Sequence, residues 1–106
     1  MKYYSVAEIE ITNPSWTQNY VQNVTGIVER FGGRYLARTS RGEKWEGERA
    51  IPQLFLLVEW PSRETAQAFY ESEEYAPYLR DRLAGSRGEM VLLPGEDVAR
   101  IAKIDG

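Results

Sequence analysis

Hydrophobic and polar residues alternate along several short segments of the chain, and this two-residue period is typical of half-buried strands. Residues 3–11 and 34–41 alternate in this way, which predicts the first two strands. Residues 54–60 are apolar on both faces except for Glu59, as expected for a strand buried on both sides in the centre of a sheet. The short run 89–93 predicts a fourth strand.

Between these strands, apolar residues recur at three- and four-residue spacing, which predicts helices. Asn13-Pro14 supplies an N-cap and a first-turn proline for the first helix, and Gly32-Gly33 ends it. Ser62 is the expected N-cap of a second helix that ends near Ser72. A short helix follows before the glycines of 85–88 break it. The predicted core face of the second helix consists of Ala66, Phe69 and Tyr70.

The elements follow one another as strand, helix, strand, strand, helix, strand, the split βαβ arrangement of ferredoxin-like domains. Right-handed crossovers leave a gap between the first two strands, and the third strand fills it in the antiparallel direction. The expected class is therefore α+β, a ferredoxin-like βαββαβ domain with a four-stranded antiparallel sheet over residues 1–95. In the C-terminal tail, 96–106, Val98, Ile101 and Ile104 predict either a docking helical turn or an arm over a neighbouring molecule.

The two helices of such a domain cover one face of its sheet, and the chain has no further element for the other face. Since the central strand 54–60 is apolar on both faces, the open face would expose a larger apolar patch than monomers usually tolerate. We therefore expect a homodimer in which two subunits pack sheet to sheet, as a dimeric α/β-barrel.

Composition removes several classes of function. The 106 residues fit one domain, and a net charge of -3 argues against a nucleic-acid partner, which requires a basic face. The chain has no cysteine and no histidine, so disulfides, thiolate nucleophiles and the commonest metal ligand and general base are all missing. Carboxylates show no metal-site spacing. Any chemistry must use carboxylates, Tyr, Lys, Arg or hydroxyls, and we expect no cofactor.

The first ten residues contain no apolar segment long enough for a signal peptide. No run approaches the roughly 20 apolar residues of a membrane span. A soluble cytoplasmic protein with no membrane partner is the expectation.

A set of short motifs occurs in order along residues 3–95. The motifs are Gly32-Gly33-Arg34-Tyr35-Leu36 with Arg38, Glu46-Gly47, Val58-Glu59-Trp60-Pro61-Ser62, Ala66, Ala68-Phe69-Tyr70, Ser72, Glu74-Tyr75 and Arg82. In these the chain resembles domain-of-unknown-function family thirteen-thirty, of the dimeric α/β-barrel superfamily. It departs from that pattern at Trp60, where Phe is expected, at Phe69, where Trp is expected, and at Asp81, where Leu is usual.

The resemblance implies the fold and the dimer but no activity. Better-known members of the superfamily include cofactor-free oxygenases of aromatic polyketides, haem-degrading enzymes, small isomerases and stress-response barrels. Haem enzymes with a histidine ligand are disfavoured because this chain has no histidine.

Glu59 is the first candidate for chemistry because it is the only charge within the apolar central strand. Burial would raise its pKa towards neutrality and make it a general base, unless a nearby arginine holds it ionised. The structural alternative is an ion pair with Arg38 across neighbouring strands, or a position at the wet end of the strand.

Arginines and tyrosines are the candidate ligand-binding residues. Arg38 and Arg82 offer guanidinium groups that match a carboxylate or an enolate. The departure at Asp81 leaves open whether Arg80 or Arg82 takes the inward position. Three aromatic residues are predicted to line a pocket for a flat ligand, with the core as the alternative: Tyr35, Tyr70 and Tyr75.

Two hypotheses follow. In the first, the protein is a cofactor-free enzyme or binder that acts on a small carbonyl- or carboxylate-bearing molecule. In the second, it is a non-catalytic structural or stress-response dimer without a small-molecule substrate, and the acid and the arginines form an interface network.

Overall fold

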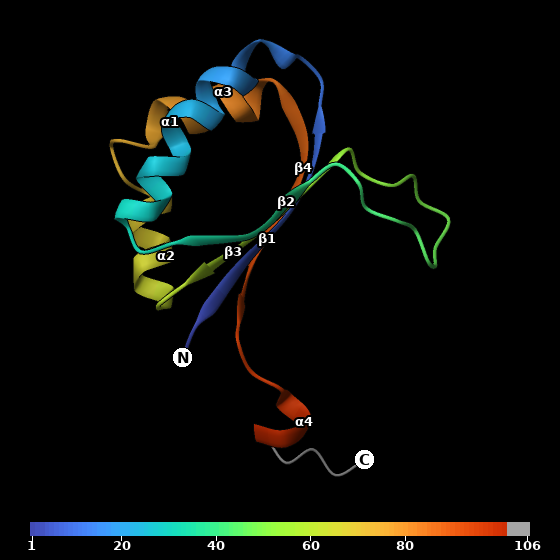
Figure 1. The fold of residues 1–106 in the computed structure, drawn as a ribbon, viewed down its shortest axis with the longest axis vertical. Coiled ribbons are helices and arrows are strands. Elements are labelled where there is room, and N and C mark those ends of the chain that lie inside the picture. The colour runs from blue at the N-terminus through green and yellow to red at the C-terminus, as the bar shows by residue number, and fades with distance from the viewer. Residues whose placement is uncertain (102–106) are drawn as a thin grey trace.

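One layer of helices covers one face of a four-stranded sheet in the computed structural model, which describes residues 1–101 (Figure 1). The elements are β1 (Tyr3–Ile11), the 3-10 turn η1 (Pro14–Trp16), α1 (Thr17–Arg30), β2 (Arg34–Thr39), β3 (Leu54–Trp60), α2 (Arg63–Tyr70), α3 (Ala76–Ala84), β4 (Ser86–Pro94) and α4 (Val98–Ile101).

The strands lie in the order β2-β3-β1-β4, and every neighbouring pair is antiparallel. β3 therefore fills the gap between β1 and β2 that the two crossovers leave, which confirms the predicted ferredoxin-like α+β fold. The edges of the sheet are β2 and β4.

Strand boundaries match the prediction at β3 and differ at the two edge strands. β2 ends at Thr39, two residues before the predicted end. β4 spans Ser86–Pro94 and not only 89–93, because all nine residues of β1 find a partner in it, from Ile11 opposite Ser86 to Tyr3 opposite Pro94. The glycine of this segment, Gly88, lies opposite Ile9 within the ladder and does not break the strand.

The predicted caps are present at both main helices. Asn13 accepts a hydrogen bond from the backbone N–H of Ser15 at 3.0 Å, at the start of the 3-10 turn that leads into α1. The chain leaves α1 through Gly32, whose φ of +93° is strained for other residues. Ser62 and Thr65 form a reciprocal capping box at α2.

The core lies between α1, α2 and the inner face of the sheet, and its apolar side chains are Val24, Ile27, Val28, Val58, Trp60, Ala66, Phe69 and Tyr75. Trp60 is anchored by a 2.8 Å hydrogen bond from its Nε1 to Oγ of Ser5 on the neighbouring strand. Gly33 allows the indole to approach the chain, since a Cβ there would lie 2.8 Å from the Trp60 ring. The prediction of Tyr70 as a core residue is wrong: its side chain is 42% exposed at the edge of the helix layer.

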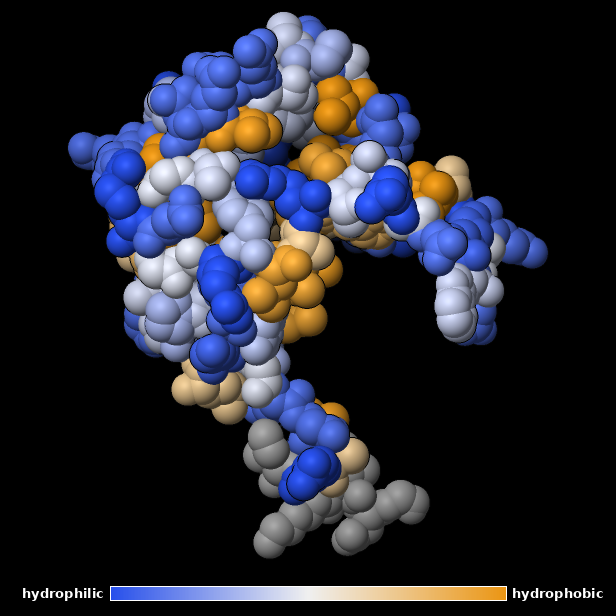
Figure 2. Space-filling model, in the orientation of Figure 1, coloured by the Kyte–Doolittle hydropathy of each residue, from blue (hydrophilic) through white to orange (hydrophobic). Residues whose placement is uncertain are grey.

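The second face of the sheet is not covered by any element of residues 1–101. The register places Val6, Leu57 and Glu59 on this open face, with Leu93 of β4 beside them. Leu93 is 47% exposed. The loop 40–53 and the C-terminal segment both project on this side, and Figure 2 shows hydrophobic residues along the hollow between them.

The C-terminal segment turns away from the sheet after Pro94 and forms one helical turn, α4 (Figure 1). This turn contains Val98, so the helical turn expected for the tail is present, but it lies away from the sheet and its docking stays a prediction. Ile104 lies outside the described residues. The division into a domain, 1–95, and a tail, 96–106, stays a prediction.

Candidate functional site

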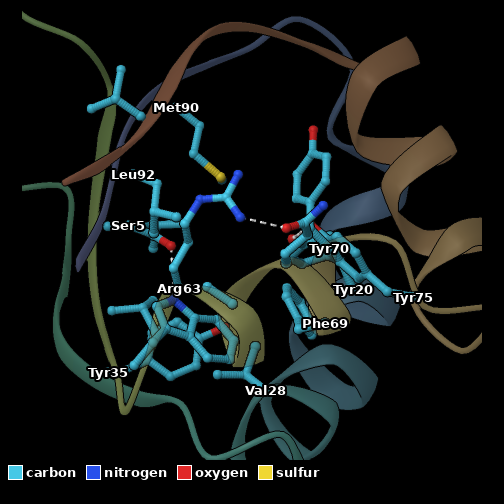
Figure 3. Close-up of a pocket in the computed structure, with 16 residues that line it drawn as sticks. Ser5, Tyr20, Val28, Tyr35, Arg63, Phe69, Tyr70, Tyr75, Met90 and Leu92 are labelled. Carbon is cyan, nitrogen blue, oxygen red and sulfur yellow. Dashed lines mark hydrogen bonds between the residues drawn. The ribbon is translucent and has the colours of Figure 1, made fainter. Parts of the chain in front are cut away.

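A cavity of about 330 Å³ opens between the helix layer and the inner face of the sheet (Figure 3). All four strands contribute residues to it, mostly from the inner face of the sheet; the exception is Val91 of the edge strand β4, whose register places it on the open face. The lining residues are Ser5, Tyr20, Val28, Tyr35, Leu56, Val58, Trp60, Arg63, Ala66, Gln67, Phe69, Tyr70, Tyr75, Met90, Val91 and Leu92.

The walls of this aromatic cavity are mostly rings and aliphatic side chains. Phe69 and Tyr75 stack at a centroid distance of 4.2 Å, and Trp60 lies 5.2 Å from Phe69. Leu56 and Val58 form the sheet side because alternate residues of β3 face the helices. Such a surface suits a flat, largely apolar molecule.

Polar groups gather at the mouth of the aromatic cavity. Arg63, Gln67 and Tyr70 lie on one side of α2, four and three residues apart, and all three are exposed. Nη1 of Arg63 donates to Oε1 of Gln67 at 2.7 Å. In Figure 3 the Arg63 side chain reaches across the cavity from α2 towards Met90. Sequence reasoning missed Arg63 and Gln67, although their spacing from Ala66 and Tyr70 marks one helical stripe.

The inner end of the cavity contains two tyrosine hydroxyls in contact. The hydroxyl oxygens of Tyr20 and Tyr75 lie 2.5 Å apart, and Nη2 of Arg82 donates to the Tyr75 hydroxyl at 3.4 Å. Burial, and then the neighbouring Tyr75, raise the pKa of Tyr20 well above its usual range. Tyr20 therefore keeps its proton at physiological pH. Tyr20 was not among the predicted site residues, because its spacing in the sequence fits the apolar side of a helix and carries no mark of a site.

The three predicted tyrosines do meet at this cavity, but Arg38 lies outside it. The Arg38 guanidinium stacks over the ring of Tyr35 at 4.0 Å and donates to Oγ1 of Thr25 at 2.9 Å. Burial raises the pKa of Tyr35, although the charge of Arg38 opposes that rise. Arg38 thus supports the outer side of a cavity wall.

A β-bulge in β2 explains the position of Arg38. The register shifts between Tyr35, opposite Val58, and Ala37, opposite Leu57. Because one residue is inserted, Arg38 lies opposite Leu56 and returns to the same sheet face as Tyr35. The simple alternation expected for this strand is therefore wrong. The ion pair between Arg38 and Glu59, one of the two structural alternatives for Glu59, is wrong as well, because the two residues lie on opposite faces of the sheet.

Of the two arginines on α3, Arg82 faces the interior and Arg80 is exposed. Arg82 is only 6% exposed. It does not line the aromatic cavity itself, but contacts it through the Tyr75 hydroxyl.

Glu59 lies on the open face, away from the aromatic cavity. Its carboxylate accepts hydrogen bonds from Nζ of Lys2 and Nη2 of Arg34, both at 3.2 Å, and the Tyr4 hydroxyl lies 3.4 Å away. Partial burial favours a higher pKa for Glu59, but the bonds and charges of Lys2 and Arg34 outweigh it and lower the pKa. Of the two outcomes expected for Glu59, the raised pKa is therefore wrong and the carboxylate held ionised by a nearby arginine, Arg34, is confirmed. The catalytic role of Glu59 stays a prediction.

Residues 1–101 contain no group of three or more Asp and Glu side chains placed to hold a metal ion. In the same part of the chain, no helix has the length and apolarity needed to cross a membrane.

The sequence model of a protein family described as "Domain of unknown function (DUF1330)" matches residues 2–96. None of the curated proteins matches the chain. Sequence comparison therefore gives a family but no activity.

Solved structures with the same fold have little sequence identity with this chain. A protein of unknown function from Rhodopseudomonas palustris is 14% identical, with a TM-score of 0.75 over 91% of this chain and 84% of that one. SnoaB, a cofactor-independent oxygenase from Streptomyces nogalater, is 12% identical, with a TM-score of 0.65 over 91% and 94%. An antibiotic biosynthesis monooxygenase is 18% identical, with a TM-score of 0.52 over 92% and 100%. These likenesses show the fold alone.

The pairing of Glu59 predicts a pH-dependent stability. A carboxyl group whose pKa is lowered by folding stabilises the protein above its unfolded pKa, near 4.5, and loses this effect as the pH falls through the folded value. Glu59→Gln should therefore lower the free energy of unfolding at pH 7, and the difference from wild type should shrink towards pH 3. Urea unfolding at one protein concentration measures this.

Glu46→Gln is the control, because Glu46 lies exposed in the loop 40–53 and should have no effect at either pH. A Glu59→Gln defect of equal size at pH 7 and pH 3 would show that the ion pairs contribute nothing and that only packing was lost.

Proposed function

The chain belongs to a family of domains of unknown function, DUF1330, whose name assigns no activity, and we propose its function from its geometry. The protein binds a small, flat molecule with a carbonyl or carboxylate group in the aromatic cavity. The observation that carries this proposal is the combination of apolar, ring-lined walls with an arginine and an amide at the mouth.

The walls and the mouth make different contributions to binding. A flat ligand would bury its faces against Phe69, Tyr75 and Leu56, which favours binding through removal of apolar surface from water. Its oxygen atoms would then reach Arg63 and Gln67, whose side chains can exchange their mutual hydrogen bond for bonds to the ligand. Tyr70, at the rim, would cover the bound molecule.

A more specific form of this proposal is that the protein converts the bound molecule without a cofactor. The fold is shared with a cofactor-independent oxygenase. However, no Asp or Glu is among the residues that line the aromatic cavity, so a proton acceptor there would have to be a phenol hydroxyl. The predicted acceptor Glu59 would meet a ligand only on the open face. We therefore propose binding and assign no reaction.

We also propose that two copies pair through their open sheet faces. The exposed apolar residues of β4, Val91 and Leu93, lie beside Val6 and Leu57 on a face that nothing in residues 1–101 covers. The loop 40–53 projects on the same side and carries Trp45, which is 89% exposed. A second copy would cover this surface.

The alternative function is a purely structural dimer without a ligand. The observation that favours it is the Glu59 cluster, because an acid on the open face that is paired with Lys2 and Arg34 suits a polar edge of an interface. Ligand binding separates the two functions, since the structural dimer requires none.

Ligand binding is tested with a matched pair of probes, 2-naphthoate and the neutral 2-acetylnaphthalene. Arg63→Gln should weaken 2-naphthoate by about tenfold or more, because a hydrogen bond to a charged group is worth roughly 1.5–3 kcal/mol, and should affect the ketone less. Arg80→Gln, on the exposed side of α3, is the control and should leave both affinities unchanged. Calorimetric titration of both probes with wild type, Arg63→Gln and Arg80→Gln measures the six affinities. If neither probe binds the wild type, or if Arg80→Gln weakens binding as much, the proposal fails.

The dimer is tested by a charge on the open face. Leu93→Asp would bury an unpaired carboxylate in the interface, which should weaken the dimer by about 2 kcal/mol or more. Val21→Asp is the matched control on α1, since Val21 is 49% exposed on the helix layer. Sedimentation should find wild type and Val21→Asp at twice the monomer mass and Leu93→Asp nearer the monomer. A monomeric wild type would exclude sheet-to-sheet pairing.

A further inference from the structure

A hollow of about 450 Å³, here called the edge hollow, lies between α3 and the edge strand β4. Its lining includes Leu83 of α3 and the consecutive residues 86–90 of β4. The register places Arg87 and Glu89 on the open face of the sheet and Met90 on the inner face. Since residues from both faces of β4 line it, the edge hollow reaches the free edge of this strand.

The lining of the edge hollow combines exposed apolar groups with positive charge. Leu83 is 58% exposed, and Met90 and Tyr70 beside it are also exposed, although apolar groups gathered in this way usually mark a contact surface. The lining contains two arginines, Arg82 and Arg87, and one acid, Glu89. Arg87 forms no ion pair within residues 1–101. An apolar group with acidic neighbours would fit this surface.

The loop 40–53 carries a group of this kind. The fully exposed indole of Trp45 lies in it, with three acids nearby that form no ion pair in the described part of the chain: Glu43, Glu46 and Glu48. The charge of Lys44 is turned back to the base of the loop, because its Nζ donates to the carbonyl oxygen of Arg49. The base is held on the open face by an ion pair of 3.4 Å between Arg49 and Glu8.

Sheet-to-sheet pairing can bring this loop to the edge hollow of a second copy. When two such sheets close into a barrel about a two-fold axis parallel to the strands, β2 of one copy lies beside β4 of the other, and equal levels along the strands meet. The loop leaves β2 after Thr39, whose row across the sheet runs through Phe55 and Glu8 to Glu89 of β4. It therefore leaves the sheet at the level of the edge hollow.

The loop is also long enough to pass the partner's sheet. The chain from Thr39 to Trp45 spans up to about 20 Å when extended. Packed sheets lie only about 10 Å apart. Figure 1 shows the loop projecting from the sheet on the side of the open face, where the second copy would lie.

We propose that Trp45 of each copy inserts into the edge hollow of its partner subunit, a contact that rests on the sheet-to-sheet dimer proposed above. The indole lies against Leu83 and Met90, and the acids of the loop face Arg87. Tyr70 and Met90 line both the edge hollow and the aromatic cavity. The partner's Trp45 therefore also supports one wall of the ligand site, which is incomplete in a single copy.

The contact is tested in a dimer mixed from full chains with ¹³C-labelled methyl groups and unlabelled full chains. Isotope-filtered NOEs in this dimer arise only between the two copies. We expect NOEs from the Trp45 ring protons of the unlabelled copy to the Leu83 and Met90 methyl groups of the labelled copy. This measurement needs no substitution, so it decides even if a variant fails to fold.

Dimer affinity gives a second test, by sedimentation over a range of concentrations. Trp45→Ala should raise the dimer Kd at least about tenfold, because a tryptophan that fills a pocket is a typical interface hot spot. Leu83→Ala should raise it as well, and the double variant should lose less than the two single effects combined, since both remove one contact. Val21→Ala is the matched control, an exposed apolar residue on α1, and should leave the Kd unchanged.

A wild-type dimer without NOEs between Trp45 and Leu83 or Met90 would overturn this contact and leave the sheet-to-sheet dimer intact. The same conclusion would follow from an unchanged Kd in Trp45→Ala or Leu83→Ala, or from NOEs of Trp45 to the partner's Val6 and Leu57 instead. A monomeric wild type would overturn the contact and the dimer together.

Discussion

The whole structure depends on one constraint: a four-stranded sheet with an apolar central strand has helices on only one of its faces. On the covered face, rings from the helices and the strands pack against Trp60 but leave room for the aromatic cavity. On the open face, apolar residues of β1, β3 and β4 have no cover within the described chain. Because alternate residues of β3 belong to opposite faces, the proposed ligand site and the proposed dimer surface use different residues of the same strand.

Much of the fold could be predicted because its signals are local. The double-sided apolarity of 54–60 gave the central strand, and Ser62 and Gly32 marked the start of one helix and the end of another. The edges were harder. The bulge after Tyr35 leaves no local mark in the sequence, yet it moves Arg38 to the other face of the sheet. A single inserted residue therefore changed the role of a candidate ligand-binding residue.

The chemistry of the candidate site was less predictable, because it depends on partners far apart in sequence. Burial was expected to raise the pKa of Glu59 unless an arginine held it ionised, and the sequence could not decide between the two. The fold brings Glu59 next to Lys2 and Arg34, and its pKa is lowered. Sequence reasoning could have found Arg63, since it occupies the same helical stripe as Ala66 and Tyr70. The burial of Arg82 without an acid could not be found in this way, because an unpaired group is defined by what surrounds it.

We propose ligand binding on the covered face of the sheet and subunit pairing on the open face. The most direct test is the set of intermolecular NOEs between the ring protons of bound 2-naphthoate and the methyl groups of the protein. The account predicts NOEs to Val28, Leu56 and Ala66, which line the aromatic cavity. NOEs to Val6, Leu57 and Leu93 instead would place the ligand on the open face and contradict the assignment of the two faces.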